Sequence, residues 1–177
     1  MKGIMKFIHY TTQQIWDSIP KSGILDPKQG KKYMKDEDRS LYALSEEAHE
    51  KWESYMAPDK DPSEKPTPLL KYFIRDRIAN RGTPIRVEFD ITEDDGVFVY
   101  ERAFSQLRAF KPYFIAGNNG ENPPKPEGWD EARQKYYDSK TPLAEYDGSF
   151  ILPEMCITTP IEKSRATQTT FPDSLKP

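Results

Sequence analysis

The sequence predicts an α+β fold whose sheet is mainly antiparallel. Strand-like and helical segments follow one another in the order β-α-β-α-α, several further strands come next, and no regular run of βαβ units is present. The clearest strand, residues 85–91, alternates apolar with charged residues, which indicates a half-buried strand. These two observations favour an antiparallel sheet with flanking helices over a doubly wound parallel one.

Composition bounds the size and class of the protein. The chain has 177 residues, of which 36% are apolar and 31% charged, enough for one domain with a core. We expect a single domain over residues 1–161 and a poorly ordered polar tail over residues 162–177. The net charge of −3 gives no broad basic field, which argues against a nucleic-acid partner.

The sequence also bears on compartment and redox state. No apolar run approaches the roughly 20 residues of a membrane span, and residues 1–6 lack the apolar region of a signal peptide. The single cysteine, Cys156, excludes a disulfide framework and a cysteine-based zinc site. We therefore expect a cytoplasmic protein without a membrane partner, while delivery into another cell without an N-terminal signal stays open.

Two strand–helix pairs open the chain. Residues 6–10 are typical of a short strand, and Thr11 is expected to cap the helix that follows, with Gln14 reaching back in a capping box. Residues 40–44 form a second expected strand, and Ser45 should cap the next helix. Each pair therefore places a strand end directly before a helix.

The later elements are read from turn and capping signals. Thr67 and Pro68 predict the start of a third helix that Gly82 ends. Asp95 and Gly96 form a hairpin-type turn between the 85–91 strand and the next strand. The remaining predicted elements are a strand at 97–100, a short helix at 103–111, a helix at 129–139 and strands on both sides of Pro153.

Motifs of several large enzyme classes are absent. The chain has no GxGxxG, GxxxxGK[ST], GxSxG or HExxH pattern. The two histidines, His9 and His49, lie apart, and His49 is expected on a charged helix face, so we predict no metal site. A nucleophile pair of His9 with Cys156 is conceivable, but no third orienting group suggests itself.

Three residues stand out by their position. His9 lies where a strand passes into a helix and backbone N–H groups are free to hold a polar ligand. Tyr42 lies in a strand just before a helix. Glu154 lies at a strand start, because Pro153 cannot donate to a ladder, and a carboxylate there can face a cleft. Taken singly, each has an ordinary explanation: an exposed or satisfied histidine, a core tyrosine and an exposed edge glutamate.

Taken in order, the segments around these residues resemble the three motifs of ADP-ribosyltransferase-fold proteins of the His-Tyr-Glu branch, the branch of diphtheria-type toxins and poly(ADP-ribose) polymerases. The matched segments are Ile8-His9-Tyr10-Thr11, Leu41-Tyr42-Ala43-Leu44-Ser45-Glu46-Glu47-Ala48 with Trp52, and Glu154-Met155-Cys156-Ile157-Thr158-Thr159-Pro160-Ile161. The resemblance implies an ADP-ribosyltransferase-like fold, in which a split, mainly antiparallel sheet is flanked by helices.

The resemblance also implies a reaction. NAD⁺ is cleaved at the nicotinamide–ribose bond through an oxocarbenium-like state, and ADP-ribose passes to an acceptor expected to be a protein. Glu154, His9 and Tyr42 are the implied catalytic residues, with Glu154 stabilising the growing positive charge. The implied NAD⁺-binding residues are His9, Tyr10 through its backbone, Thr11 through its hydroxyl, and Tyr42 by stacking on the nicotinamide. No metal is implied.

Two positions depart from the family pattern. Tyr10 stands where the family usually has glycine, so its side chain must turn away for the backbone contact to survive. Leu152 stands two residues before Glu154, where some branches place a second Glu or a Gln, and its presence argues against arginine, asparagine or cysteine acceptors.

Several alternatives stay open. A bare NAD⁺ glycohydrolase uses water as the acceptor on the same fold. An RNA 2′-phosphotransferase begins with a similar strand and helix but needs a basic surface, against which the pI of about 5.5 counts. A non-catalytic interaction module on this scaffold and an unrelated fold with coincidental motifs are the other two readings. The association of such small enzymes with toxins or effectors is analogy.

Overall fold

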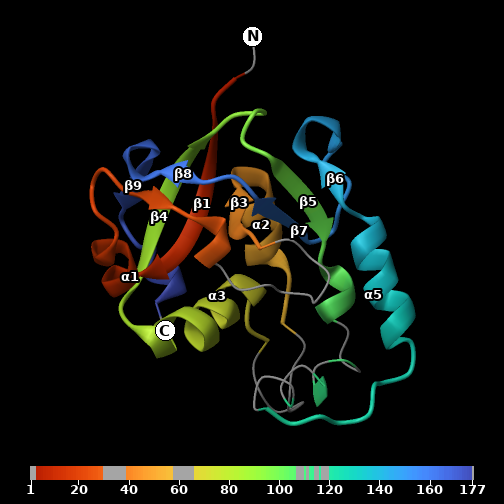
Figure 1. The fold of residues 1–177 in the computed structure, drawn as a ribbon. Coiled ribbons are helices and arrows are strands. Elements are labelled where there is room, and N and C mark those ends of the chain that lie inside the picture. Colours follow the sequence, from red (N-terminus) through yellow and green to blue (C-terminus); the bar gives the residue numbers. More distant parts are fainter. Residues whose placement is uncertain are drawn as a thin grey trace.

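The structure, a computed structural model, has a central antiparallel sheet with strand order β6-β5-β7-β3-β1-β4-β9 (Figure 1). It confirms the predicted α+β class. A second, two-stranded sheet pairs β2 with β8. The strands are β1 Met5–Thr12, β2 Ile24–Leu25, β3 Leu41–Ser45, β4 Pro84–Ile91, β5 Val97–Glu101, β6 Thr141–Pro142, β7 Pro153–Ile157, β8 Ile161–Glu162 and β9 Ala166–Thr169. The structure describes residues 3–29, 39–57, 66–106, 110, 112–113, 116 and 120–176.

The part of the chain that the structure describes has four α-helices around the sheet, with α2 and α3 against each other and α5 beside β5 (Figure 1). Short 3-10 turns connect several of the elements. No helix of the described residues is both long and apolar enough to cross a membrane. The helices are α1 Gln13–Ser18, α2 Glu46–Ser54, α3 Leu69–Phe73, which continues as a π-turn Ile74–Ile78 and a 3-10 turn Ala79–Arg81, and α5 Trp129–Asp138.

Helix capping agrees with the sequence at α2 and differs at α1 and α3. The Ser45 hydroxyl accepts the Ala48 N–H at 3.2 Å, as predicted. At α1 the cap is Thr12 instead of Thr11, because β1 runs one residue further before the chain turns. Helix α3 begins after Pro68 without a side-chain cap, so the Thr67 cap was wrong.

The two faces of β7 belong to different apolar clusters. Met155 and Ile157 join the main core, which also holds Trp52 of α2. Cys156 joins a second cluster with Tyr136 of α5. Because alternate residues of a strand point to opposite faces, Glu154 lies on the same face as Cys156.

Strand β3 changes partners along its length. Its last two residues, 44–45, pair with residues 7–8 of β1, whereas residues 41–43 pair with residues 155–157 of β7. The sheet thus divides at β3, and β1 and β7 lie on its two sides. This division positions the residues of the candidate site.

The turn at Asp95 and Gly96 does not close a hairpin, which corrects the prediction. Strands β7, β3 and β1 lie between β5 and β4 in the sheet. The buried Asp95 carboxylate accepts the Thr92 N–H at 2.7 Å and pairs with Arg165. The turn therefore carries the chain across the sheet and is held by a segment from the far end of the sequence.

The expected tail from residue 162 is instead part of the domain up to Lys176. Strand β9 pairs with β4, and Leu175 is buried near α3, where the C-terminus lies in Figure 1. An edge strand needs backbone pairing more than apolar side chains, so its polar composition did not reveal it. Of the expected 103–111 helix, the structure has a 3-10 turn at Ala103–Gln106, and residues 107–109 and 111 lie outside the described ones.

Candidate functional site

Three consecutive central strands carry the three residues that the sequence analysis selected. His9 lies on β1, Tyr42 on β3 and Glu154 on β7. The His9 Nδ1 atom is 2.6 Å from the Tyr42 backbone oxygen. Tyr42 pairs with Cys156, two residues from Glu154, so Tyr42 and Glu154 are diagonal neighbours on one face, about 7–8 Å apart between Cα atoms. The fold therefore brings together residues that are distant in sequence.

The contact of His9 with Tyr42 fixes the protonation of the imidazole. A carbonyl oxygen can only accept, so Nδ1 carries the proton and the neutral ring keeps Nε2 as an acceptor. Burial lowers the pKa of His9, and the bond to Tyr42 only partly opposes this. The ring also stacks on Phe89 at 5.4 Å between centroids. His9 is thus a neutral, oriented acceptor near neutral pH.

The Tyr10 side chain points away from His9, as successive residues of a strand do. Its hydroxyl is 2.8 Å from Nε2 of His49 on α2, and burial raises the pKa of Tyr10 to about 12. The other imidazole nitrogen of His49 lies 3.4 Å from Glu53. His49 is itself buried, which corrects its predicted place on a charged helix face.

Thr11, the remaining predicted binding residue, is 9% exposed and pairs with Ile85 of β4.

The carboxylate of Glu154 is enclosed instead of facing a cleft. The residue is 1% exposed. Oε2 contacts Nη1 of Arg102 in a short ion pair, and Oε1 accepts the Tyr136 hydroxyl at 3.4 Å. The prediction of a strand start was right, since β7 begins at Pro153, but the expected exposure was wrong. Partners from β5's end and from α5 cover the carboxylate.

Arg102 lies between Glu154 and Trp52. It directly follows β5, and its backbone N–H donates to the Leu152 oxygen at 3.0 Å. Its guanidinium carbon lies 5.3 Å from the centre of the Trp52 ring, a cation–π distance. The Trp52 indole in turn donates to the Pro153 oxygen at 2.8 Å. The arginine is therefore placed by the same backbone segment that carries Glu154.

The Glu101 carboxylate joins the end of β5 to the segment that precedes β7. Its carboxylate accepts the N–H groups of Ile151 at 2.6 Å, Leu152 at 2.9 Å and Ala103 at 3.1 Å. Three charge-assisted bonds to the backbone fix this junction. The segment before Glu154 and the segment around Arg102 are thus rigidly joined.

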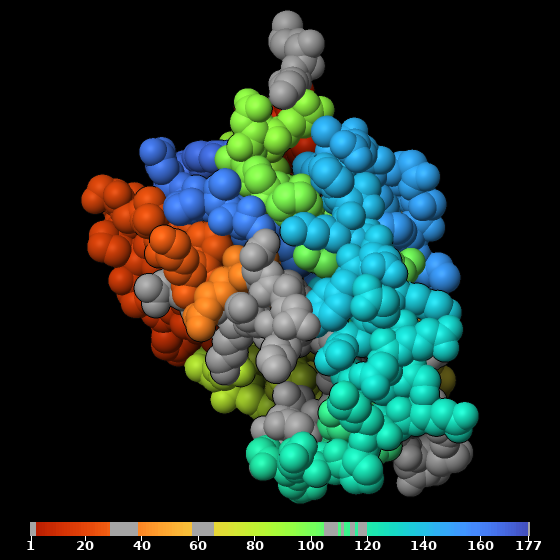
Figure 2. All heavy atoms as spheres, turned by 45° about the vertical axis from the view of Figure 1, so that its right-hand side comes forward, coloured from red at the N-terminus to blue at the C-terminus, as the bar shows by residue number. Residues whose placement is uncertain are grey.

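Aromatic rings wall the carboxylate on the α5 side. Tyr100 pairs with Glu154 in the β5–β7 register, and its ring stacks on that of Tyr136 at 4.7 Å. Helix α5 and the segment after it make up much of the face shown in Figure 2. Sequence reasoning missed Arg102, Glu101 and Tyr136, because no local pattern shows that segments so far apart converge on Glu154.

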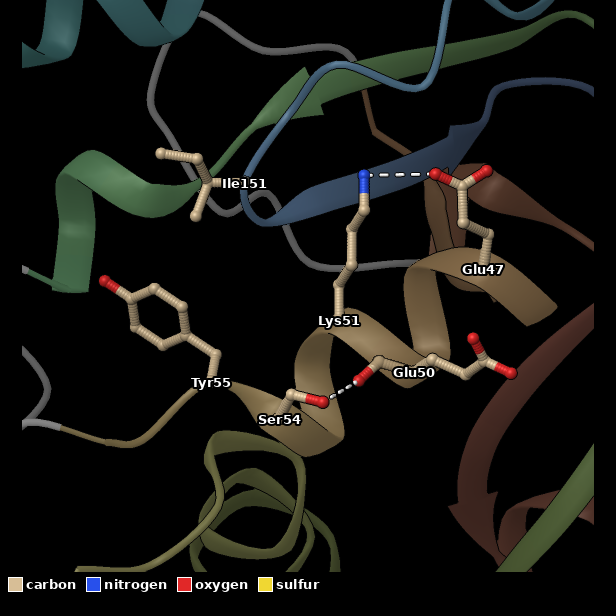
Figure 3. Close-up of a pocket in the computed structure, with 6 residues that line it drawn as sticks. All are labelled: Glu47, Glu50, Lys51, Ser54, Tyr55 and Ile151. Atoms are coloured by element: carbon tan, nitrogen blue, oxygen red, sulfur yellow. Dashed lines mark hydrogen bonds and ion pairs between the residues drawn. The ribbon is translucent and has the colours of Figure 1, made fainter.

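A separate hollow of about 420 Å³ lies on the outer side of α2 (Figure 3). Lys51 crosses it, donating to the Gly148 and Phe150 oxygens at 2.7 and 2.8 Å and pairing with Glu47. None of the predicted site residues lines it. The lining residues are Glu47, Glu50, Lys51, Ser54, Tyr55 and Ile151.

The described residues contain no group of three or more His, Cys, Asp or Glu side chains that could hold a metal ion.

Comparison of the chain with protein-family models, with curated proteins and with solved structures found no match. A functional assignment must therefore be argued from the residues of the candidate site.

Proposed function

We propose that this chain is an NAD-dependent mono-ADP-ribosyltransferase. The observation that carries the proposal is the convergence of His9, Tyr42 and Glu154 on the consecutive strands β1, β3 and β7. The three motifs were selected by their local sequence, their strand context and their order along the chain. Neighbouring strands in the sheet are a condition that the sequence order did not impose, so their adjacency is independent support.

The proposed reaction transfers a glycosyl group. The bond between the nicotinamide nitrogen and the ribose carbon breaks, and its electron pair leaves with nicotinamide. A nucleophilic atom of the acceptor forms the new bond to that carbon and loses its proton to solvent or a base. Glu154 would stabilise the positive charge that grows on the ribose, an electrostatic role that an ionised carboxylate suits.

The other residues would bind and orient the dinucleotide. His9, neutral and fixed by the Tyr42 carbonyl, offers Nε2 as an acceptor for a ribose hydroxyl. The Tyr42 ring would stack on the nicotinamide. The Tyr10 side chain is occupied by His49 on α2, which leaves it out of the way of the backbone contact proposed at this position. Thr11 would add a hydroxyl contact.

The acceptor is proposed to be a protein side chain, in keeping with the acidic pI of about 5.5. Water as the acceptor would make the same site an NAD⁺ glycohydrolase. The transferase and the glycohydrolase differ only in the acceptor that attacks the ribose carbon, which is a protein side chain in one and water in the other.

The experiment is nicotinamide release from NAD⁺, with and without a cell lysate, for the parent protein and Glu154→Gln. Glu131→Gln on the exposed side of α5 is the matched control. Release that rises with lysate and is lost only in Glu154→Gln supports the transferase. Release independent of lysate supports the glycohydrolase. Equal release by the parent and both variants would refute the assignment of Glu154.

The burial of Glu154 favours a second candidate, a non-catalytic interaction module on the same scaffold. A carboxylate that is 1% exposed and paired with a guanidinium is also what a purely structural ion pair looks like. On this reading no variant releases nicotinamide, NAD⁺ does not bind, and Glu154→Gln changes only the free energy of unfolding.

A further inference from the structure

The ion pair of Arg102 with Glu154 is in conflict with the charge that the proposed reaction needs. The Glu154 carboxylate has one oxygen on the guanidinium and the other on the Tyr136 hydroxyl. The Arg102 side chain is itself only 14% exposed. A ribose can reach the carboxylate only where one of these partners has moved.

The charge of Arg102 also conflicts with the proposed catalytic role of Glu154. Catalysis by Glu154 would rest on the field of an unbalanced negative charge beside the ribose. A guanidinium in contact with the same carboxylate cancels most of that field, and in a buried site water screens the pair very little. The contact in this structure therefore opposes both the access and the charge stabilisation proposed for Glu154.

We propose that the Arg102–Glu154 ion pair is an autoinhibitory contact, which opens when the dinucleotide binds. This inference rests on the proposed function. It names the side chain that governs access to the catalytic carboxylate, and it assigns Arg102 a regulatory role in place of a purely structural one.

The local structure allows the arginine to move without unfolding the site. Arg102 lies between β5 and the 3-10 turn Ala103–Gln106, outside regular secondary structure. The three bonds of the Glu101 carboxylate hold the backbone on both sides. The guanidinium also has a second partner in the Trp52 ring, which remains available when the carboxylate is released. Rotation of this side chain would release Oε2 of Glu154, while Oε1 keeps the Tyr136 hydroxyl.

This mechanism makes a distinctive prediction for binding. If the open form holds about one molecule in ten, the apparent Kd for NAD⁺ is raised about tenfold over the intrinsic one, and breaking the ion pair removes this factor. Arg102→Gln and Glu154→Gln should therefore both bind NAD⁺ about tenfold more tightly than the parent. Only Arg102→Gln should turn NAD⁺ over, with a raised kcat/KM.

The experiment is calorimetric titration with NAD⁺, together with nicotinamide release, for the parent, both variants and Arg165→Gln. The Arg165–Asp95 ion pair is a matched control, because it is also partly buried and lies outside the site. Unchanged or weaker NAD⁺ binding by Arg102→Gln, with the parent active, would overturn the autoinhibitory contact and leave the proposed function standing. If neither the parent nor the variants bind or cleave NAD⁺, both proposals are wrong.

A conservative variant keeps the test decisive if Arg102→Gln does not fold. Arg102→Lys retains the charge but loses the planar fork that grips a carboxylate. It should bind NAD⁺ more tightly than the parent by a smaller factor. Binding by Arg102→Lys that is equal to or weaker than that of the parent would overturn the contact in the same way.

Discussion

The imidazole of His9 donates to the backbone carbonyl of Tyr42 across 2.6 Å, at the place where β3 ceases to pair with β1. A side chain here takes over the hydrogen bond that a strand ladder would otherwise supply. This hydrogen bond satisfies the Tyr42 carbonyl where the sheet divides, and it orients the imidazole ring of His9. The contact thus belongs both to the sheet and to the candidate site.

Replacing His9 tests this contact. His9→Ala should lower the free energy of unfolding by about 1–3 kcal/mol, because a partly buried carbonyl loses its donor. His9→Asn places an amide donor near the former Nδ1 position and should recover most of that loss. Urea unfolding at pH 7.5 measures both. Equal destabilisation by Asn and Ala would show that the hydrogen bond contributes little and that ring stacking on Phe89 dominates.

Breaking the Arg102–Glu154 pair should cost stability from either side. Arg102→Met or Glu154→Leu alone leaves one charge of the pair unpaired and should cost about 1.5–3 kcal/mol. The double variant should cost clearly less than the sum, since neither charge remains. A double-mutant cycle by urea unfolding gives the coupling energy. Strict additivity would contradict the direct pairing.

Stability should fall as the solution is acidified below about pH 6.5. Burial lowers the pKa of both His9 and His49, so below the unfolded value the unfolded chain binds more protons than the folded one. Their contribution is complete above about pH 6.5 and is lost as pH falls. These are the two histidines of the chain, so the His9→Asn/His49→Gln variant should lack this step.

A second acid step belongs to Asp95. The Arg165 guanidinium holds the pKa of Asp95 below its ordinary value of 3.8. Its contribution is present above that value and is lost as pH falls below it. Asp95→Asn should reduce the low-pH step, because the exposed Asp147 and Asp173 also have a lowered pKa from their hydrogen-bond partners Ser149 and Lys176. It should leave the histidine step unchanged, and pH-dependent unfolding curves separate the two steps.

The C-terminal segment should be essential for stability. Leu175→Ala should cost about 2–5 kcal/mol, because Leu175 is 3% exposed and its side chain fills the core near α3. The neighbouring Lys176→Ala is the control and should change stability by less than about 0.5 kcal/mol, since this lysine is exposed. Thermal unfolding of the two variants measures the difference, and similar Tm values would mean that the segment is dispensable.

Local patterns predicted the elements better than their partners. The alternation along residues 85–91 and the cap at Ser45 were right, because each depends on interactions within a few residues. The Asp95-Gly96 hairpin was wrong, because a turn signal reports a chain reversal and not which strand will pair. Pairing was decided by packing with segments far along the chain.

The candidate site shows the same limit. The place of Glu154 at the start of a strand was readable from Pro153. Its burial was not, because Arg102 comes from 52 residues earlier and Tyr136 from 18 residues earlier. Likewise His49 was assigned to the solvated side of α2, whereas the Tyr10 hydroxyl on β1 gives it a buried partner. The local sequence around a glutamate does not distinguish a buried carboxylate from an exposed one.

The position of β7 in the sheet bears on how the protein is made. It lies between β5 and β3, yet it follows both in the chain. During synthesis β1, β3, β4 and β5 leave the ribosome first, and the edges of β3 and β5 stay open until residue 157 has emerged. Open edges invite pairing with other chains, and such late, non-local closure slows folding. The strand that carries Glu154 is therefore also the one whose arrival protects the nascent sheet from aggregation.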